Sequence, residues 1–361
     1  MALTLRSGLA TLAERITTPL LPSDYLDAIN PLLSGTRLRG RIVAIHPETS
    51  DASTIVIKPG RGWRQHIPGQ YLRLGVEING VRQWRTYSLT SHLNRTDGCV
   101  SITVKAVQGG IVSNHLVRHA AAGTIVELDQ ATGDFTLDGT ADKILFITAG
   151  SGITPVMGML RNLAAASSNI PNSDIPNSDI VVVHSAPSAE DVIFGAELRA
   201  LARHGHIRLV EIHTSVDGRL DVSRLIEHVG DIGGRRTWAC GPAEMLTEIE
   251  NHWAAAGIAD RLRTERFRAD IVATGDGGTV SFTTTGTDIE AAGDQSLLDA
   301  GESAGVLMPS GCRMGICFGC VAPLRRGAVR DLRNGALTTA ADNVVIQTCI
   351  SAAAGDCDIE L

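Results

Sequence analysis

Residues 310–320 read SGCRMGICFGC and place three cysteines in the spacing C-x4-C-x2-C. A fourth cysteine, Cys349, follows after 28 residues within the strand-like run VVIQTCI. This spacing is typical of plant-type [2Fe–2S] sites, in which one short loop supplies three thiolates and a distant residue supplies the fourth. Glycines in the loop let backbone N–H groups approach the sulfur atoms closely. We therefore predict that the chain binds a [2Fe–2S] cluster through Cys312, Cys317, Cys320 and Cys349.

A zinc site is the main alternative for these four cysteines. Zinc sites favour paired C-x2-C spacings, and the four-residue gap between Cys312 and Cys317 fits them poorly.

The chain has seven cysteines, and this odd count argues against a framework of disulfides. The first residues carry Arg6, Glu14 and Arg15 and no compact apolar stretch, so we expect no secretory signal. We expect a reduced protein in the cytoplasm.

Length and composition limit the possible classes of protein. A chain of 361 residues corresponds to two or three domains, and 43% hydrophobic residues exclude global disorder. No apolar run approaches 18 residues, so we expect no transmembrane helix. The net charge of −7 argues against nucleic-acid binding. Residues 270–361 hold 5 arginines, no lysine and 12 acidic residues, which indicates either ordinary surface acidity or a face for a basic partner.

The hydrophobic pattern divides the chain into an N-terminal extension and three domains. After the extension, residues 1–35, short strand-like runs over 36–139 predict an antiparallel β-barrel, interrupted by a helix-like stretch at 111–120. Residues 140–269 alternate strands and helices, which predicts an α/β domain with a parallel sheet. A tandem IPNSD at 170–179 within this domain is typical of a loop. The module at 277–361, with a helix before the cysteine loop, is expected to be α+β.

Two motifs in the predicted barrel suggest phosphate and ring binding. In Arg85-Thr86-Tyr87-Ser88 the arginine offers a fork for phosphate, the tyrosine an aromatic face and the serine a hydrogen bond. An ordinary strand with a surface arginine is equally compatible with this motif. Further on, Gly109-Gly110 opens the helix-like stretch, and a helix N-terminus is a natural anion site. The alternative there is a plain helix cap made by Ser113.

Two motifs in the α/β domain suggest dinucleotide binding. ITAGSGITP, residues 147–155, follows a buried strand and precedes a helix. Gly150 and Gly152 permit close backbone approach, and Pro155 suits a helix start, so the helix N-terminus can hold a pyrophosphate. A later strand ends at Cys240-Gly241-Pro242, and the ends of parallel strands are where ligands bind in such sheets. The alternative for Cys240 is a small buried hydrophobic residue.

With these motifs in order, residues 36–361 resemble the ferredoxin–NADP reductase superfamily carrying a C-terminal plant-type ferredoxin. The module order resembles phthalate dioxygenase reductase and related oxygenase reductases. The details, including the N-terminal extension, are similar to the actinobacterial electron-transfer partners of acyl-CoA desaturases. The resemblance implies an FAD-binding barrel at 36–139, an NAD(P)-binding domain at 140–269 and a β-grasp-type ferredoxin at 277–361.

The resemblance also implies roles for individual residues. Arg85 corresponds to the residue on the FAD pyrophosphate, Tyr87 to the one stacked on the isoalloxazine and Ser88 to the one near N5. Lys105 matches a position near the phosphate–ribose arm of FAD. The family's G-x-x-S motif, which binds the FAD phosphates, matches Gly110, Val112 and Ser113.

On the nicotinamide side, the matched turn is Gly150, Gly152, Thr154 and Pro155, with Thr154 near the nicotinamide. Cys240, Gly241 and Pro242 match the motif whose cysteine faces the junction of nicotinamide and flavin. Glu265 and Phe267 match an E-x-F motif close to the flavin. Among all these residues, the resemblance implies catalytic roles for Ser88, Cys240 and Glu265.

The choice of coenzyme is read from the end of the second strand of the α/β domain. An acidic residue there favours NADH, because it binds the ribose 2′-hydroxyl. This chain has His184-Ser185-Ala186 instead. We therefore expect NADPH, with Ser185 and Arg219 on the 2′-phosphate, and keep NADH as the alternative.

The resemblance implies that electrons pass from NAD(P)H to FAD, then to the [2Fe–2S] cluster and then to a partner desaturase or hydroxylase, either soluble or membrane-bound. The first alternative is the reductase component of a Rieske-type ring-hydroxylating dioxygenase. A second, from another class, is a redox-sensing flavin and iron–sulfur protein without turnover. A third is a structural zinc protein with a degenerate reductase body.

Overall fold

The computed structural model describes residues 30–33, 37–137, 142–168, 179–267 and 271–361. Most of the predicted N-terminal extension and nearly all of the IPNSD loop lie outside these residues. The chain forms two compact units. The first holds most of the antiparallel and parallel sheets, and the second holds the C-terminal sheets together with 83–86 and 241–247.

The predicted barrel is a six-stranded sheet with the order β4-β3-β6-β1-β2-β5. Leu89, directly after β4, bridges Ile102 of β5, so the two edges of the sheet meet and the barrel closes. Asn79 and Gly80 turn the chain between β3 and β4 with φ values of 52° and 77°, the left-handed pair that a two-residue hairpin loop needs. The elements are β1 (Arg39–Pro47), β2 (Ala52–Pro59), β3 (Tyr71–Ile78), β4 (Val81–Ser88), β5 (Val100–Lys105), α3 (Ile111–Arg118) and β6 (Ile125–Leu128), preceded by the short η1 (Pro31–Leu33).

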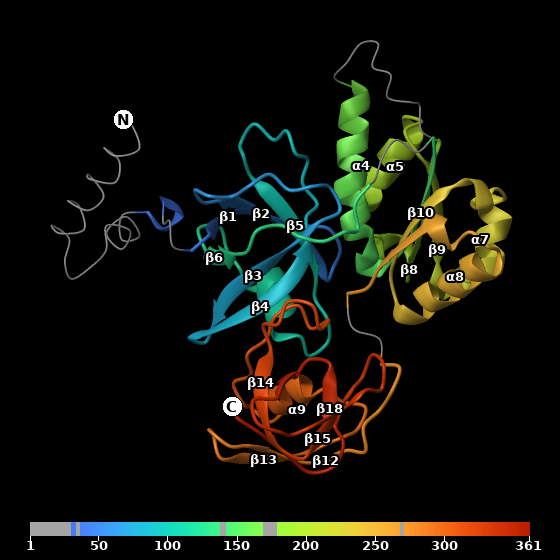
Figure 1. Cartoon of the computed structure of the whole chain (residues 1–361). Helices are drawn as coiled ribbons and strands as arrows, with labels where there is room; N and C mark the ends of the chain where they lie inside the picture. The colour runs from blue at the N-terminus through green and yellow to red at the C-terminus, as the bar shows by residue number, and fades with distance from the viewer. Residues whose placement is uncertain (1–29, 34–36, 138–141, 169–178, 268–270) are drawn as a thin grey trace, which may run out of the picture. The chain divides into compact units, whose positions relative to one another are not determined.

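The second sheet has the order β11-β10-β7-β8-β9, with parallel pairing from β10 through β9. Its central strands are continuous apolar runs, as expected for strands covered on both faces. Helices α4 and α5 lie on one face and α7 and α8 on the other (Figure 1). The strands are β7 (Lys143–Ala149), β8 (Asp179–Ala186), β9 (Arg208–His213), β10 (Arg236–Cys240) and β11 (Leu262–Glu265). The helices are η2 (Gly150–Gly152), α4 (Ile153–Ser168), η3 (Ala189–Asp191), α5 (Gly195–Arg203), α6 (Thr214–Asp217), α7 (Val222–Val229), η4 (Ile232–Gly234), α8 (Ala243–Ala255) and η5 (Ala259–Arg261).

The order of the parallel strands has a functional consequence. From β7 the chain adds β8 and β9 on one side and then returns to add β10 on the other. Ligands of open α/β sheets bind at this kind of switch point, beyond the carboxyl ends of the strands. The switch lies between β7, which leads into Gly150, and β10, which ends at Cys240.

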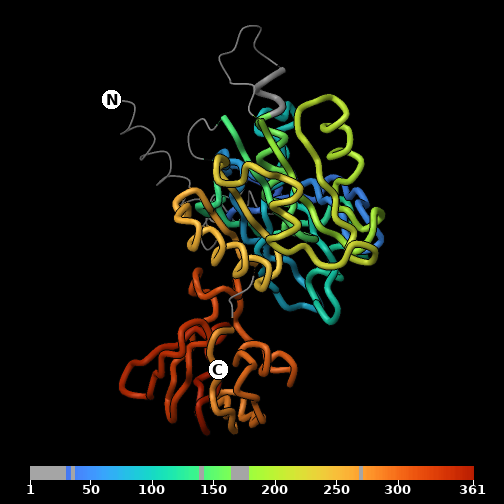
Figure 2. Tube along the Cα trace, turned by 90° about the vertical axis from the view of Figure 1, so that its right-hand side faces the viewer, coloured from blue at the N-terminus to red at the C-terminus, as the bar shows by residue number. Residues whose placement is uncertain are grey.

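The C-terminal module combines a mixed sheet, β13-β12-β19-β14-β17, with a three-stranded sheet, β16-β15-β18. Helix α9 packs Leu297 and Leu298, both fully buried, into the core, and Ser296 caps it by accepting a hydrogen bond from Asp299 N at 3.1 Å. The trace from 271 to the C-terminus, orange to red in Figure 2, forms one folded body. Its elements are β12 (Gly278–Phe282), β13 (Thr287–Ala291), α9 (Leu297–Ser303), β14 (Val321–Arg326), β15 (Ala328–Asp331), β16 (Leu337–Thr339), β17 (Val345–Gln347), β18 (Ser351–Ala353) and β19 (Cys357–Ile359).

These sheets confirm the predicted fold class of an antiparallel barrel, a parallel α/β domain and an α+β module. The helix-like stretch predicted inside the barrel is α3. No helix of the described part of the chain is long and apolar enough to cross a membrane.

His184 lies within the parallel sheet and predicts a response to acid. Its side chain is fully buried, Nδ1 lies 2.8 Å from Thr148 Oγ1, and Nε2 has no hydrogen-bond partner among the described residues. Burial lowers the pKa of His184 from 6.5 to about 4. Between these pH values the folded domain therefore binds fewer protons than the unfolded chain. We expect the contribution of neutral His184 to be complete above pH 6.5 and to fall by up to about 1.4 kcal/mol per pH unit down to about pH 4.

Replacing His184 with asparagine should flatten this pH dependence, because an amide does not titrate. Hydrogen exchange of the β7 and β8 amides, followed from neutral to acidic pH, measures the free energy of opening of this domain in the full chain. The control is His228→Asn, which changes an exposed histidine of the same domain and should keep the wild-type slope. A wild-type slope in His184→Asn contradicts the prediction.

Candidate functional site

The cysteine loop directs backbone N–H groups at its own sulfur atoms. Cys312 N lies 3.1 Å from Cys317 Sγ, and Cys317 N lies 3.4 Å from Cys312 Sγ. Met314 N and Gly319 N donate to the same two sulfur atoms at 3.3 and 3.4 Å. Burial acts to raise the pKa of Cys312, but these N–H groups outweigh it and hold the pKa below its usual value. At Cys312 the loop therefore favours thiolate, the form that ligates iron, whereas burial raises the pKa of Cys317.

Glycine is required where this loop winds most tightly. Gly315 has a φ of 72°, and a Cβ there would lie 2.7 Å from Arg333 Nη1 and 2.8 Å from Ile350 Cδ1. Arg313 and Phe318 also have positive φ, at 59° and 54°. The winding brings Cys312 and Cys317 together as a pair.

Cys349 does not lie on the strand predicted for it. It was expected on a strand, but β17 ends at Gln347 and Cys349 lies in the turn that follows. The reason is Thr348, whose N and Oγ1 both donate to Cys320 O, at 3.1 and 2.9 Å, and turn the chain out of the strand. This contact places Cys349 beside Cys320.

The four thiols form two pairs, Cys312 with Cys317 and Cys320 with Cys349. The hydrogen bond from Cys349 lowers the pKa of Cys320 to about 6, and the same bond raises the pKa of Cys349. Among the described residues, no three His, Cys, Asp or Glu side chains converge on one point as a single metal ion requires. Two pairs match a [2Fe–2S] cluster, in which each of two irons takes two thiolates. A pocket of about 530 Å³, lined in part by Asp299 and Arg313, borders Cys349.

The parallel sheet brings the predicted nicotinamide residues to one edge. In the register of the strands, Cys240 on β10 pairs with Thr148 on β7, and Thr148 pairs with His184 on β8. Ser185 lies one residue further along β8, opposite Ala149. Cys240 is fully buried, and Gly241 and Pro242 follow it in the chain. The edge therefore gathers three of the predicted segments at the switch point.

The turn after β7 has the shape that a dinucleotide needs. Gly150 has a φ of 53°, and a Cβ placed on it would meet nothing within 4 Å, so the backbone there is open to a ligand. Gly152 and Thr154 are buried, and Thr154 Oγ1 donates to Ser151 O at 2.9 Å. Pro155 is the third residue of α4. The first N–H groups of α4 have no partner within the helix and can bind a pyrophosphate.

Strand β4 carries the predicted flavin residues on alternate faces. Arg85 and Tyr87 share one face, while Thr86 and Ser88 lie on the other. Arg85 Nη1 donates to Trp84 O at 2.7 Å, and Tyr87 packs against the barrel core. Thr86 Oγ1 is buried without a hydrogen-bond partner among the described residues. Thr86 had no predicted role, but a hydroxyl without a partner beside these residues fits a polar ligand.

The side chains predicted to bind FAD phosphates around α3 have contacts within the protein. Gly110 is the N-cap, and Ser113 Oγ accepts from Val107 N at 3.2 Å, so Ser113 does not cap the helix. Val112 is buried in the barrel core, which leaves only its backbone for a phosphate. Lys105 Nζ lies 2.8 Å from Asp51 Oδ1, so its charge already has a protein partner.

Glu265 and Phe267 follow at the end of β11. Burial raises the pKa of Glu265 to about 8, and its Oε2 has no hydrogen-bond partner among the described residues. Phe267 is an aromatic residue left 39% exposed. Contact of Glu265 and Phe267 with the flavin stays a prediction.

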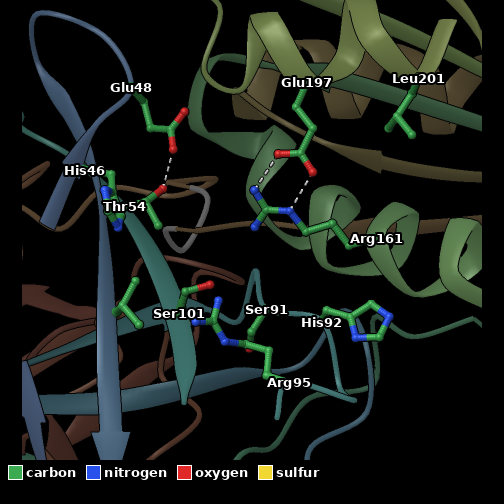
Figure 3. Close-up of a pocket in the computed structure, with 11 residues that line it drawn as sticks. His46, Glu48, Thr54, Ser91, His92, Arg95, Ser101, Arg161, Glu197 and Leu201 are labelled. Atoms are coloured by element: carbon green, nitrogen blue, oxygen red, sulfur yellow. Dashed lines mark hydrogen bonds and ion pairs between the residues drawn. The ribbon is translucent and has the colours of Figure 1, made fainter. Parts of the chain in front are cut away.

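A separate pocket of about 490 Å³ lies between the barrel and helices α4 and α5 (Figure 3). No residue of the predicted sites lines it. Its hydroxyl groups include Ser91 Oγ, which is buried without a partner among the described residues. The pocket is lined by His46, Glu48, Thr54, Val56, Ser91, His92, Arg95, Ser101, Arg161, Glu197 and Leu201.

Three family models match successive parts of the chain. The oxidoreductase FAD-binding domain matches residues 63–137, and the oxidoreductase NAD-binding domain matches 146–251. The 2Fe-2S iron–sulfur cluster binding domain matches 282–354, which includes the four paired cysteines. The cofactors of this chain are thus FAD, a pyridine nucleotide and a [2Fe–2S] cluster.

Individual proteins match almost the whole chain. An NADPH oxidoreductase of Mycobacterium tuberculosis is 48% identical over 360 residues, covering 98% of this chain and 92% of that protein. A glycine betaine monooxygenase reductase subunit of Pseudomonas aeruginosa is 30% identical, covering 92% and 98%. Phthalate dioxygenase reductase shares the fold, with a TM-score of 0.62 at 22% identity over 90% of this chain and 98% of its own. The chain is an oxidoreductase that belongs to the ferredoxin–NADP reductase superfamily, among the members that join FAD-, NAD- and [2Fe–2S]-binding domains in one polypeptide.

Proposed function

We propose that this chain takes electrons from NADPH, passes them through FAD to the [2Fe–2S] cluster and delivers them to a partner desaturase or hydroxylase. The observation that carries the proposal is the set of two thiol pairs in a loop whose N–H groups already point at the sulfur atoms. FAD accepts a hydride, which carries two electrons, whereas the cluster accepts one electron at a time. A chain with both cofactors suits an oxygen-activating partner that is reduced in single steps.

The geometry supports the proposed ligands. We assign the cluster to Cys312, Cys317, Cys320 and Cys349. The pyrophosphate of the coenzyme is assigned to the turn at Gly150 and Gly152, where the open backbone meets the start of α4. Cys240, at the end of β10, pairs with Thr148 of β7 and so lies at the same edge of the sheet as this turn. Arg85 and Tyr87, which share one face of β4, are assigned to the phosphate and ring of FAD.

NADPH is proposed over NADH on three observations. The end of β8 reads His184-Ser185-Ala186, without the acid that would bind a ribose 2′-hydroxyl. The first carboxylates after β8, Glu190 and Asp191, each lie 2.8 Å from the Ser188 hydroxyl. The Mycobacterium tuberculosis relative is named for NADPH. We expect Ser185 and Arg219 to contact the 2′-phosphate.

The kind of acceptor is proposed from the relatives and from charge. The Pseudomonas relative is named as the reductase subunit of a monooxygenase. The similarity to partners of acyl-CoA desaturases favours a desaturase among the oxygen-activating enzymes. The acidic excess in 270–361 suits a basic docking face on that enzyme. We place this electron transfer in the cytoplasm.

Visible absorption of the purified protein under anaerobic conditions tests the proposal directly. We expect flavin and iron–sulfur bands, one FAD and two irons per chain, and rapid bleaching by NADPH. The specificity constant for NADPH should exceed that for NADH by roughly tenfold or more, because a 2′-phosphate contact is charge-assisted. A colourless preparation that contains zinc, or bound cofactors that NADPH does not reduce, contradicts the proposal.

The acceptor is tested by coupled turnover. Purified acyl-CoA desaturase and the oxygenase component of a Rieske-type dioxygenase are added separately, each with its own substrate. We expect substrate-dependent NADPH consumption with the desaturase. Turnover with the Rieske component alone would reassign the partner while leaving the electron path intact.

A further inference from the structure

The barrel and the α/β domain meet where the chain leaves the flavin strand. Residues 89–93, directly after β4, run along one side of helix α4. A Cβ on Gly158 of α4 would lie 2.3 Å from the carbonyl oxygen of Leu89, which is closer than real Cβ contacts come. The helix backbone therefore touches the barrel at Gly158, and glycine alone permits this approach.

Asn162 makes the second contact of this interface. Its Nδ2 donates to Ser91 O at 3.2 Å, and its Oδ1 accepts from Leu93 N at 2.9 Å. The side-chain amide of Asn162 thus makes two backbone hydrogen bonds to residues 91–93 of the kind that a neighbouring strand would make. The same Nδ2 also donates to Gly158 O at 2.7 Å, which fixes the side chain against its own helix.

Arg161 makes the third contact and ties in helix α5. Nη1 donates to Thr90 O at 2.6 Å. Nε and Nη2 donate to the two carboxylate oxygens of Glu197 at 2.9 and 2.6 Å (Figure 3). The guanidinium also stacks on Phe194, 4.9 Å from the ring centroid. Phe194 holds a φ of 61°, a strained conformation for a bulky residue, which the surrounding structure must maintain.

These contacts connect the predicted coenzyme turn to the predicted flavin strand through one helix and one short segment of chain. Residues 158, 161 and 162 lie on one face of α4, since side chains three and four apart are neighbours on a helix. Helix α4 starts directly after the coenzyme turn at Gly150–Gly152, and at 1.5 Å per residue Gly158 is only about 8 Å along it. Residues 89–93 directly follow Arg85–Ser88.

We propose that Gly158, Arg161 and Asn162 are positioning residues that set the distance between the nicotinamide-binding turn and the flavin-binding strand. The inference rests on the proposed function, in which a hydride leaves the nicotinamide with its two electrons and reduces the flavin. Hydride transfer needs close approach, and a displacement of about 1 Å can slow an oriented reaction roughly a hundredfold. None of the three residues needs to contact either cofactor.

Gly158→Ala is the sharpest test, because its methyl group must push α4 away from Leu89. Anaerobic stopped-flow measurement of flavin reduction separates the limiting rate from the Kd for NADPH. We expect the limiting rate to fall by roughly tenfold to a hundredfold, with the Kd and the FAD content within about twofold of wild type. The matched control is Gly233→Ala in the same domain, where an added Cβ meets nothing within 4 Å.

Two further variants keep the test valid if Gly158→Ala fails to fold. Arg161→Met removes the hydrogen bonds while keeping the length of the side chain, and Asn162→Ala releases the backbone of residues 91–93. We expect each to slow flavin reduction by roughly threefold to tenfold at unchanged Kd. Arg235→Met removes an arginine from ion pairs with Asp179 and Asp231 within the α/β domain and should leave the limiting rate unchanged.

Hydrogen exchange gives a readout that does not depend on electron transfer. The Leu93 amide donates to Asn162, so Asn162→Ala should accelerate exchange in a peptide covering residues 89–95, and Arg235→Met should not. If the exchange pattern changes as expected but flavin reduction stays within twofold in all three variants, the interface is structural only and the inference is wrong. If the exchange pattern is unchanged, the contacts themselves are wrong. A wild-type protein that NADPH cannot reduce refutes the proposed function instead.

Discussion

Replacing Cys317 with serine is expected to leave ferricyanide reduction by NADPH near the wild-type rate while cytochrome c reduction falls to roughly 1%. Ferricyanide takes electrons from the flavin, whereas cytochrome c is reduced through the cluster. Serine does not supply a thiolate, and Cys317 accepts the N–H groups of Cys312 and Gly319 at 3.1 and 3.4 Å, so its loss disrupts one of the two thiol pairs. The FAD- and NAD-binding domains contain none of these contacts.

The measurements are the two activities per bound FAD, together with iron and acid-labile sulfide per chain. The control is Cys357→Ala in the same module, because Cys357 is fully buried and burial raises the pKa of its thiol to about 11. This variant should retain the cluster and both activities. Persistence of both activities in Cys317→Ser would place the cluster off the electron path, and loss of both would indicate a damaged fold.

The features that sequence predicts well in this chain are those determined by neighbours along the chain. The spacing of Cys312, Cys317 and Cys320 limits how the loop can wind, and the glycines in it are needed for the positive φ and the close packing seen at Gly315. The continuous apolar runs of β7 and β8 indicate strands covered on both faces, and the helices between them require a parallel sheet. These features are therefore visible without a structure.

The features that sequence does not predict depend on partners far away in the chain. In the sequence nothing distinguishes Arg161 from other polar residues of a helix, yet it donates a hydrogen bond to Thr90, 71 positions earlier. Cys349 leaves its strand because Thr348 bonds to Cys320, 28 positions away. Lys105 forms an ion pair with Asp51, which the pairing of β2 with β5 brings close. No local pattern signals such contacts, because only the tertiary fold creates them.

Replacing Arg85 with alanine is expected to weaken FAD binding by roughly tenfold to a hundredfold, which corresponds to the loss of one charge-assisted phosphate contact of about 1.5–3 kcal/mol. Arg85 shares one half-buried face of β4 with Tyr87, so its guanidinium and the aromatic ring can bind one ligand together. The measurement is the Kd of the apoprotein for FAD, followed by quenching of flavin fluorescence. The purified variant should also lose FAD on dilution.

Arg82→Ala is the matched control, because Arg82 lies on the opposite face of the same strand and pairs with Glu127 at 2.5 Å. It should bind FAD as the wild type does. Arg85→Lys then separates charge from geometry, since lysine keeps the charge but cannot form the two parallel hydrogen bonds of a guanidinium. Intermediate affinity in Arg85→Lys would mean that charge supplies part of the binding and the fork the remainder. Full FAD affinity in Arg85→Ala would instead leave the N–H groups at the start of α3, or Lys105, as the phosphate site.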